Sequence, residues 1–364
     1  MKKLAIIPWD ESIKKDNLYK KSNNCWHSRF KQTFEENGYE FHTIDMYSDL
    51  REVDWFLFFT LNYGWLWRVV RCGKKGKMIY CSGEPAVVKA ENSADGYKEL
   101  LKIFSFILTW NEDLIDGKRI LKRCIPYDFQ KQYGNVPFEK RKLMVNVSGN
   151  KHSTHPDELY SEREKVISYF EQYASDEFDL YGTGWNKDEH PSYKGVIDDK
   201  MELYHHYRFA LCLENTKNVK GYLTEKLFDC FCAGIVPVYS GADDVNKYVP
   251  SECFISYNQF KSVAEMRRFL KEMEKKEYEK YLSEIDRLLN SNLQKEFTGE
   301  LFAKQVIMGM EKIETYEAVE ISREAKKKIV GRAFKENKDR MILYAKLICK
   351  KIIRLLKGKK NAEK

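Results

Sequence analysis

The sequence lacks three features that would decide its class at once: a long apolar run, a CxxC pair and a DxD triplet. The apolar run near the start, Leu4–Ile7, is closed by Pro8. It is too short for the core of a signal peptide or for a membrane span. Export is therefore not expected. The sequence also shows no repeat with a period of 20 to 50 residues.

The nine cysteines form no metal-binding pattern. Their number is odd, and Cys230 and Cys232 stand two apart on a predicted helix, where side chains diverge. We interpret them as reduced core thiols, which fits a reducing cytoplasm.

The excess of positive over negative charge lies at the end of the chain. The net charge is +8, but residues 323–364 hold sixteen Lys/Arg and four Asp/Glu, which is +12 and leaves −4 for residues 1–322. The basic balance is thus no argument for nucleic-acid binding by the body of the protein. The 364 residues, 43% of them hydrophobic, are enough for two domains with their own cores and exclude a disordered chain.

Two series of alternating strands and helices follow one another. In the first, the apolar runs predict buried strands, and helical spacing separates them. The expected strands are Lys3–Pro8, Trp55–Thr60, Lys77–Cys81 and Phe104–Leu108, and the expected helices are Trp26–Glu36, Trp65–Val70 and Tyr97–Ile103. Alternation of this kind is typical of a parallel sheet built from βαβ units.

The second series begins after a basic stretch at residues 140–142. Its expected strands are Leu143–Val147, Phe178–Tyr181, Phe209–Leu213 and Ile235–Tyr239, with helices at Asp157–Tyr173, Thr224–Ala233, Val263–Leu289 and Gly299–Ile313. We expect an α/β protein with domains at 1–140 and 141–320, a cleft between them, and a basic tail at 321–364.

The strongest functional pattern lies between Phe209 and Gly241. A loop with Glu214 and Asn215 follows the carboxyl end of a strand, where open α/β sheets bind ligands. Thr224 then stands at the N-cap of a helix, whose free N–H groups and dipole favour an anion. Lys226 would add charge for a diphosphate, and Glu225 would accept hydrogen bonds from ribose hydroxyls. The alternative is that Thr224 and Glu225 only cap the helix and Lys226 is solvated.

Three segments of this stretch resemble the donor-binding motif of glycosyltransferase family 10, the α-1,3-fucosyltransferases. They are Phe209-Ala-Leu-Cys-Leu-Glu-Asn215, Gly221-Tyr-Leu-Thr-Glu-Lys226 and Ala233-Gly-Ile-Val-Pro-Val-Tyr-Ser-Gly241. The resemblance covers some thirty positions closely and residues 78–260 more weakly. It implies two Rossmann-like domains that face each other across a cleft, the GT-B fold, with GDP-fucose as donor substrate.

The resemblance also assigns roles to individual residues. It places Glu225 on the ribose, Lys226 on the phosphates, Tyr222 near the nucleoside and Asn215 on the nucleotide sugar. Arg163 corresponds to the family arginine, and an arginine fork suits a diphosphate leaving group. Without the resemblance, Arg163 would be read as a surface residue between two glutamates.

Glu84 is the candidate general base. It follows the strand at Lys77–Cys81 in a turn shaped by Gly83 and Pro85, which aims its carboxylate into the expected cleft. Its position resembles that of the family's catalytic glutamate, whereas an isolated Gly-Glu-Pro turn would carry no such meaning.

No metal or permanently bound cofactor is expected. A departing diphosphate is stabilised either by a divalent metal on a DxD motif or by fixed cations and a helix N-terminus. Without a DxD, Arg163, Lys226 and the helix that begins at Thr224 would serve. Asp243 departs from the family pattern after Gly-Ala, which leaves the choice of donor sugar open because this loop could face that sugar.

The segment 341–357 has the pattern of an amphipathic surface helix. Four of its five cations, Lys346, Lys350, Arg354 and Lys357, would fall within roughly 80° of one another on a helix, with a broad apolar surface across the rest. This predicts contact with an anionic membrane surface. A helix that packs on the body of the protein, with a solvated basic stripe, is the alternative.

The sequence thus predicts an inverting, metal-independent transferase that moves fucose or a related sugar from a GDP-sugar to a saccharide hydroxyl. We expect a cytoplasmic protein on the inner face of the membrane, an oligosaccharide or lipid-linked acceptor, a place in lipopolysaccharide or capsule synthesis, and no nucleic-acid partner. The alternatives are a transferase with a different nucleotide sugar and a non-catalytic nucleotide-sugar-binding membrane scaffold.

Overall fold

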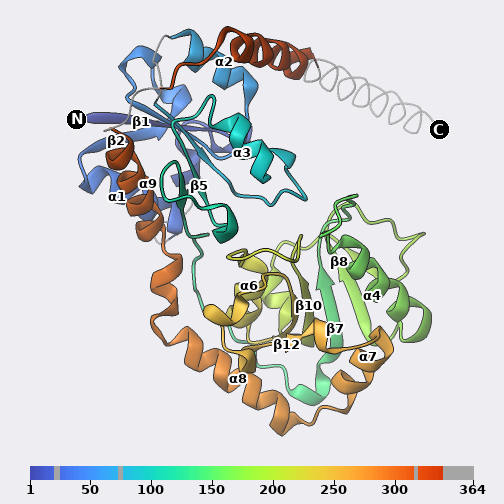
Figure 1. The fold of residues 1–364 in the computed structure, drawn as a ribbon. Helices are drawn as coiled ribbons and strands as arrows, with labels where there is room; N and C mark the ends of the chain where they lie inside the picture. Colours follow the sequence, from blue (N-terminus) through green and yellow to red (C-terminus); the bar gives the residue numbers. More distant parts are fainter. Residues whose placement is uncertain (20–24, 73–76, 315–318, 339–364) are drawn as a thin grey trace, which may run out of the picture.

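The computed structural model describes residues 1–19, 25–72, 77–314 and 319–338. Two six-stranded parallel sheets form the centres of two α/β domains (Figure 1). Both sheets are parallel throughout, as the alternation of strands and helices predicts.

The first sheet has the strand order β2-β1-β3-β4-β5-β6. Its strands are β1 Lys2–Ile7, β2 Tyr39–Thr43, β3 Trp55–Phe58, β4 Met78–Cys81, β5 Phe106–Thr109 and β6 Ile120–Lys122. The helices α1 Trp26–Glu36, α2 Tyr63–Arg71 and α3 Ala94–Leu100 lie between them in sequence. All expected elements of this domain are present. The sequence did not predict β2, whose burial alternates, or β6, which has three residues.

The second sheet has the order β12-β11-β10-β7-β8-β9. Its strands are β7 Lys142–Val147, β8 Phe178–Tyr181, β9 Tyr193–Gly195, β10 Tyr207–Leu213, β11 Val236–Ser240 and β12 Ile255–Ser256. Its helices are α4 Tyr160–Tyr173, α5 Lys200–Tyr204, α6 Glu225–Ala233, α7 Val263–Glu272 and α8 Lys275–Leu289. Gly234 ends α6 in the left-handed conformation, with φ of 70°. The single helix expected over Val263–Leu289 is two helices.

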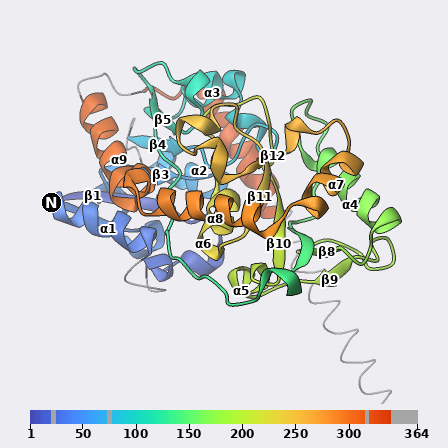
Figure 2. The same cartoon turned by 90° about the horizontal axis from the view of Figure 1, so that it is seen from below.

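The chain returns to the first domain after α8. Helix α9, Gly299–Glu314, lies beside α1 in both views (Figure 1, Figure 2). Phe302 of α9 is buried against Phe30 of α1, with 4.6 Å between ring centroids. The sequence assigned residues up to 320 to the second domain, whereas the apolar side of α9 covers the first sheet. Amphipathic spacing shows that a helix has a buried side but not which sheet it covers.

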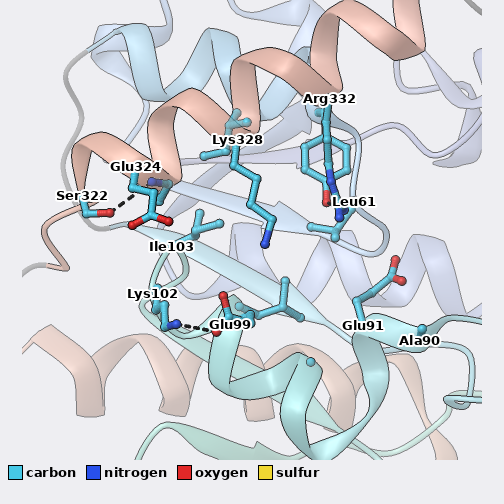
Figure 3. A pocket seen from close by; sticks show the side chains of 15 residues that line it. Leu61, Ala90, Glu91, Glu99, Lys102, Ile103, Ser322, Glu324, Lys328 and Arg332 are labelled. Atoms are coloured by element: carbon cyan, nitrogen blue, oxygen red, sulfur yellow. Dashed lines mark hydrogen bonds and ion pairs between the residues drawn. The ribbon is translucent and has the colours of Figure 1, made fainter.

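Residues 323–338 form a further helix, which packs on the first domain through Ile329 and Ala333. The guanidinium of Arg332 lies over the ring of Tyr63, at 5.1 Å. Figure 3 shows the hollow under this helix, into which the side chain of Lys328 extends. The expected membrane-contacting segment, 341–357, lies outside the described residues. In the part of the chain that the structure describes, no helix has both the length and the apolar character needed to cross a membrane.

Candidate active site

A cleft of about 670 Å³ lies between the two domains and brings all the predicted site residues together. The first domain contributes the turn after β4 and the residues that follow β1 and β6. The second domain contributes the loop after β7, part of α4, and the motif between β10 and α6. The lining residues are Trp9, Trp26, Gly83, Glu84, Arg123, Ile125, Val147, Ser148, Gly149, Lys151, Arg163, Lys200, Asn215, Tyr222, Thr224, Glu225 and Lys226.

Glu84 meets the second domain directly. Its carboxylate accepts a hydrogen bond from Nδ2 of Asn215 at 3.5 Å, between residues that are 131 positions apart in the sequence. The backbone of the turn that carries Glu84 is held in place because Asn92 donates to the carbonyl of Glu84 at 2.6 Å. The side chain therefore projects from a held backbone toward the donor motif.

The loop between Asn215 and α6 is packed against the first domain. The Tyr222 ring lies 4.5 Å from that of Trp110, and Nε1 of Trp110 donates to the carbonyl of Gly83 at 3.0 Å. Gly221 has φ of 82°, and a Cβ there would stand 2.3 Å from the carbonyl oxygen of Trp110. Only glycine fits this approach, which explains its place before Tyr222 in the motif.

The N-terminus of α6 differs from the expectation. Thr224 caps the helix through its side chain, as predicted, but an internal carboxylate already faces it. Glu214, with no exposed surface, accepts hydrogen bonds from the backbone N–H and the hydroxyl of Thr224 at 3.1 and 2.8 Å. The group at this helix end is therefore a protein side chain, whereas the sequence predicted free N–H groups of this helix for a diphosphate. The N–H groups of Thr224 and Lys226 are already bonded within the protein.

Lys226 is likewise not a free cation. Its ammonium donates to Glu214 at 3.1 Å and lies 3.6 Å from Glu225. Burial disfavours the charged ammonium, but the two carboxylates outweigh it and raise the pKa of Lys226. Partial removal from water favours neutral Glu225, yet Lys226 and Lys200 lower the pKa of that carboxyl. Both groups are charged in the cleft, and the Glu225 side chain is 58% exposed.

Arg163 is deeply buried, not a surface residue among glutamates. It is 3% exposed, and its Nη2 donates to the backbone carbonyls of Leu213 and Glu214 at 2.8 and 3.4 Å. Burial lowers the pKa of the guanidinium. Among the residues that the structure describes, its Nε has no hydrogen-bond partner and no carboxylate forms an ion pair with it. The charge is thus held near the carboxyl end of β10 by backbone carbonyls alone.

The lining of the cleft is mainly positive. It includes the side chains of Arg123, Lys151, Arg163, Lys200 and Lys226, against the two carboxylates of Glu84 and Glu225. Such a cleft suits an anionic ligand.

The sequence analysis placed Glu214 in the ligand-binding loop after the run Phe209–Leu213 but gave it no role. It did not name Lys200 or Arg123 as parts of the site. Asp243 does not line this cleft; it borders a separate hollow with Ser240.

Comparison with known proteins identifies the second domain. Residues 138–298 match the family model described as glycosyltransferase family 10 (fucosyltransferase), C-terminal part. This domain belongs to glycosyltransferase family 10. A family 10 domain therefore supplies Arg163, Asn215, Tyr222, Thr224, Glu225 and Lys226, and the preceding domain supplies Glu84.

Curated relatives match part of the chain. An α-(1,4)-fucosyltransferase from Arabidopsis thaliana is 41% identical over 68 residues, which are 19% of this chain and 17% of that protein. The human 4-galactosyl-N-acetylglucosaminide 3-α-L-fucosyltransferase 9 is 32% identical over 158 residues, which are 42% of this chain and 40% of that protein. The chain thus spans at most about two fifths of the length of these relatives.

Solved structures match over both domains. An α1,3-fucosyltransferase crystallised with GDP covers 88% of this chain and 92% of its own, with a TM-score of 0.53 and 17% identity. The Anabaena protein Alr3699/HepE, in complex with UDP and glucose, covers 85% and 100%, with a TM-score of 0.53 and 9% identity. At these identities the likeness shows the fold, and the predicted GT-B-like pair of domains is confirmed.

Proposed function

We propose that this family 10 protein is an inverting, metal-independent fucosyltransferase that moves fucose from GDP-fucose to a saccharide hydroxyl. The observation that carries the proposal is the contact between Glu84 and Asn215, which joins the candidate base to the donor motif across a positively charged cleft. The family of the second domain, and relatives that are α-1,3- and α-1,4-fucosyltransferases, support fucose as the transferred sugar.

In the proposed reaction, Glu84 accepts the proton of the acceptor hydroxyl as its oxygen attacks the anomeric carbon of fucose. The bond from that carbon to the β-phosphate oxygen breaks, and GDP leaves with both bonding electrons. A positioned carboxylate that removes this proton contributes about 10²- to 10⁴-fold in rate. The Asn215 amide orients the carboxylate and keeps the base close to the donor.

Charge on the leaving GDP would be balanced by Arg163 and Lys226. Arg163 is already held by backbone carbonyls, and none of the described residues provides a hydrogen-bond partner for its Nε. Lys226 is kept charged by Glu214, so both cations are positioned before the ligand arrives. Thr224 acts through this network rather than by donating its N–H group to phosphate.

The nucleoside would lie against Tyr222 and Glu225. The exposed, ionised carboxylate of Glu225 suits two ribose hydroxyls, and the Tyr222 ring is held in place by Trp110. We further propose α-1,3 linkage to an oligosaccharide or lipid-linked glycan, in surface-polysaccharide synthesis at the inner face of the membrane. The basic pattern of 341–357 supports this location.

Glu84→Gln tests the function. The change keeps the size of the side chain and should leave GDP affinity unchanged while transfer falls by about 10²-fold or more. Affinity is measured by the shift in melting temperature with GDP, UDP, dTDP and CMP, because ligands that bind only the native state raise it. Transfer is measured as GDP release with a glycan panel.

Glu91→Gln, a nearby change outside the cleft, should leave both measurements unchanged. Full activity of Glu84→Gln would exclude Glu84 as the base. A shift with UDP instead of GDP would assign another donor, and GDP binding without turnover by the unmodified protein would indicate a binding protein.

A further inference from the structure

Arg123 is a buried cation that the donor-site argument does not use. It follows β6 in the first domain, is 5% exposed and lines the interdomain cleft. Its guanidinium lies over the Phe302 ring of α9, with 4.9 Å to the centroid. Within the described part of the chain, its Nε has no hydrogen-bond partner.

The surroundings of Arg123 provide no counter-charge. Among the described residues, no aspartate or glutamate forms an ion pair with it. Its polar neighbour is Cys81, and burial raises the pKa of that thiol to about 11, so the thiol is neutral. A buried charge without a partner is costly, and proteins keep such a group where a ligand completes it.

Three partly buried cations, Lys200, Lys226 and Arg119, are satisfied by the protein. Lys200 pairs with Asp229 at 2.9 Å, and Lys226 pairs with Glu214. Arg119, which precedes β6, donates to the carbonyls of Leu101, Phe104 and Ser105. Arg123 differs from these three cations. It lines the interdomain cleft, and its guanidinium keeps N–H groups that no described residue accepts.

Two tryptophans line the same wall. Trp9 follows β1 and is 41% exposed, and Trp26 begins α1. Like Glu84 after β4 and Arg123 after β6, Trp9 comes from the carboxyl edge of the first sheet. Indole rings offer large rigid apolar faces, which suit the C–H face of a sugar ring. The first-domain side of the cleft therefore combines two indole rings that suit a sugar ring with the unpaired guanidinium of Arg123.

We propose that Arg123, Trp9 and Trp26 form an acceptor subsite for a saccharide that carries an anionic group close to the reacting hydroxyl. The acceptor role rests on the proposed function, whereas the anion specificity rests on the geometry of Arg123. The anionic group is a carboxylate of an acidic sugar or a phosphate attached to a sugar. Either one would form charge-assisted hydrogen bonds with the guanidinium and supply the missing counter-charge.

The test compares three sugars of similar size on the full chain saturated with GDP. Methyl β-D-glucuronide carries a carboxylate, glucose 1-phosphate carries a phosphate, and methyl β-D-glucoside is neutral. Titration followed by NMR gives the affinities. At least one anionic sugar should bind about tenfold or more tighter than the neutral one. The preferred sugar decides between carboxylate and phosphate, and equal affinities, or no binding of either anionic sugar, would overturn the proposal.

Variants separate a binding role from a structural one. Arg123→Met should abolish the anionic preference, and Arg123→Lys should restore part of it, because the charge returns without the fork. Arg119→Met is the matched control: it removes a partly buried arginine beside the same strand and should leave the preference intact. Trp9→Ala should weaken the charged and neutral sugars alike, whereas Tyr173→Ala, which removes an exposed aromatic of α4, should weaken neither.

GDP affinity distinguishes the remaining outcomes. If Arg123→Met and Arg123→Lys both weaken GDP binding as strongly as Arg163→Met does, Arg123 serves the donor diphosphate and the proposal is wrong. Failure of the proposed function would instead appear as an absence of GDP binding by the unmodified protein. The anionic preference, measured without nucleotide, would still report on Arg123 in that case.

Discussion

Glu214 holds other residues of the donor motif in place. Its carboxylate accepts hydrogen bonds from Thr224 and pairs with Lys226, so three positions of the motif form one buried unit. Burial raises the pKa of Glu214, because removal from water penalises the ionised form. Lys226 and Thr224 oppose that penalty.

Glu214→Gln should therefore destabilise the protein by about 3 kcal/mol, since it leaves the charge of Lys226 without its buried partner. Urea unfolding measures the loss as a lower midpoint. Glu225→Gln is the matched control: its side chain is exposed, so the midpoint should hardly move while GDP binds more weakly. Equal destabilisation by the two changes would contradict the assignment of Glu214 as the structural partner.

At the scale of elements, the loop between β10 and α6 is shaped by its contact with the first domain. Gly221 combines a left-handed backbone with a close approach to the carbonyl of Trp110. Lys220 pairs with Asp113 of the first domain at 2.6 Å, and the Gly221 N–H donates to Asp244 at 2.7 Å. The loop that carries Asn215 and Tyr222 is thus held from both sides.

Gly221→Ala should reduce GDP affinity by about tenfold or more, because the added Cβ forces the loop away from Trp110 and moves Tyr222 with it. Gly38→Ala isolates the backbone cost, since Gly38 has φ of 81° but nothing within 4 Å of a Cβ. That control should lower stability slightly and leave GDP affinity unchanged. Calorimetric titration of both variants gives the comparison, and a normal affinity in Gly221→Ala would show that the loop tolerates displacement.

An element could be predicted from the sequence when its own residues carried a recognisable pattern. Buried strands such as β3 and β10 are continuous apolar runs, and Thr224 and Gly234 mark the ends of α6, so these could be predicted closely. The strands β6 and β12 have three and two residues and carry no pattern. Each pairs with the strand before it in the chain, but two or three residues are too few to show a strand period.

The site residues likewise fall into those that the sequence revealed and those that it did not. Asn215, Tyr222, Glu225 and Lys226 fall within twelve residues, so one motif revealed them together. The partners of those residues did not show in the sequence, because Trp110 lies in the other domain. A glutamate at a strand end is usually solvated, and nothing local shows that Glu214 is enclosed.

At the scale of the whole molecule, the chain crosses between the domains more than once. Glu112 of the first domain pairs with Lys247 of the second at 2.7 Å, and Tyr127 donates to Asp229 of α6 at 2.6 Å. Helix α9 and residues 323–338 then return to the first domain. The last part of the described chain therefore stabilises the domain that carries Glu84. A cut at residue 322 would keep α9 and remove the support that residues 323–338 give.

A chain that ends at residue 338 should separate membrane contact from stability. It keeps the buried Ile329 and the contact of Arg332 with Tyr63, so its melting temperature should equal that of the full chain. It lacks the cations of 341–357, so it should no longer sediment with anionic vesicles, while the full chain sediments with them and not with neutral ones.

A chain that ends at residue 322 should lose about 2 kcal/mol of stability with the burial of Ile329, so its melting temperature should be lower. If the chain that ends at residue 338 still sediments with anionic vesicles, the membrane-binding surface lies in the body of the protein and not in 341–357.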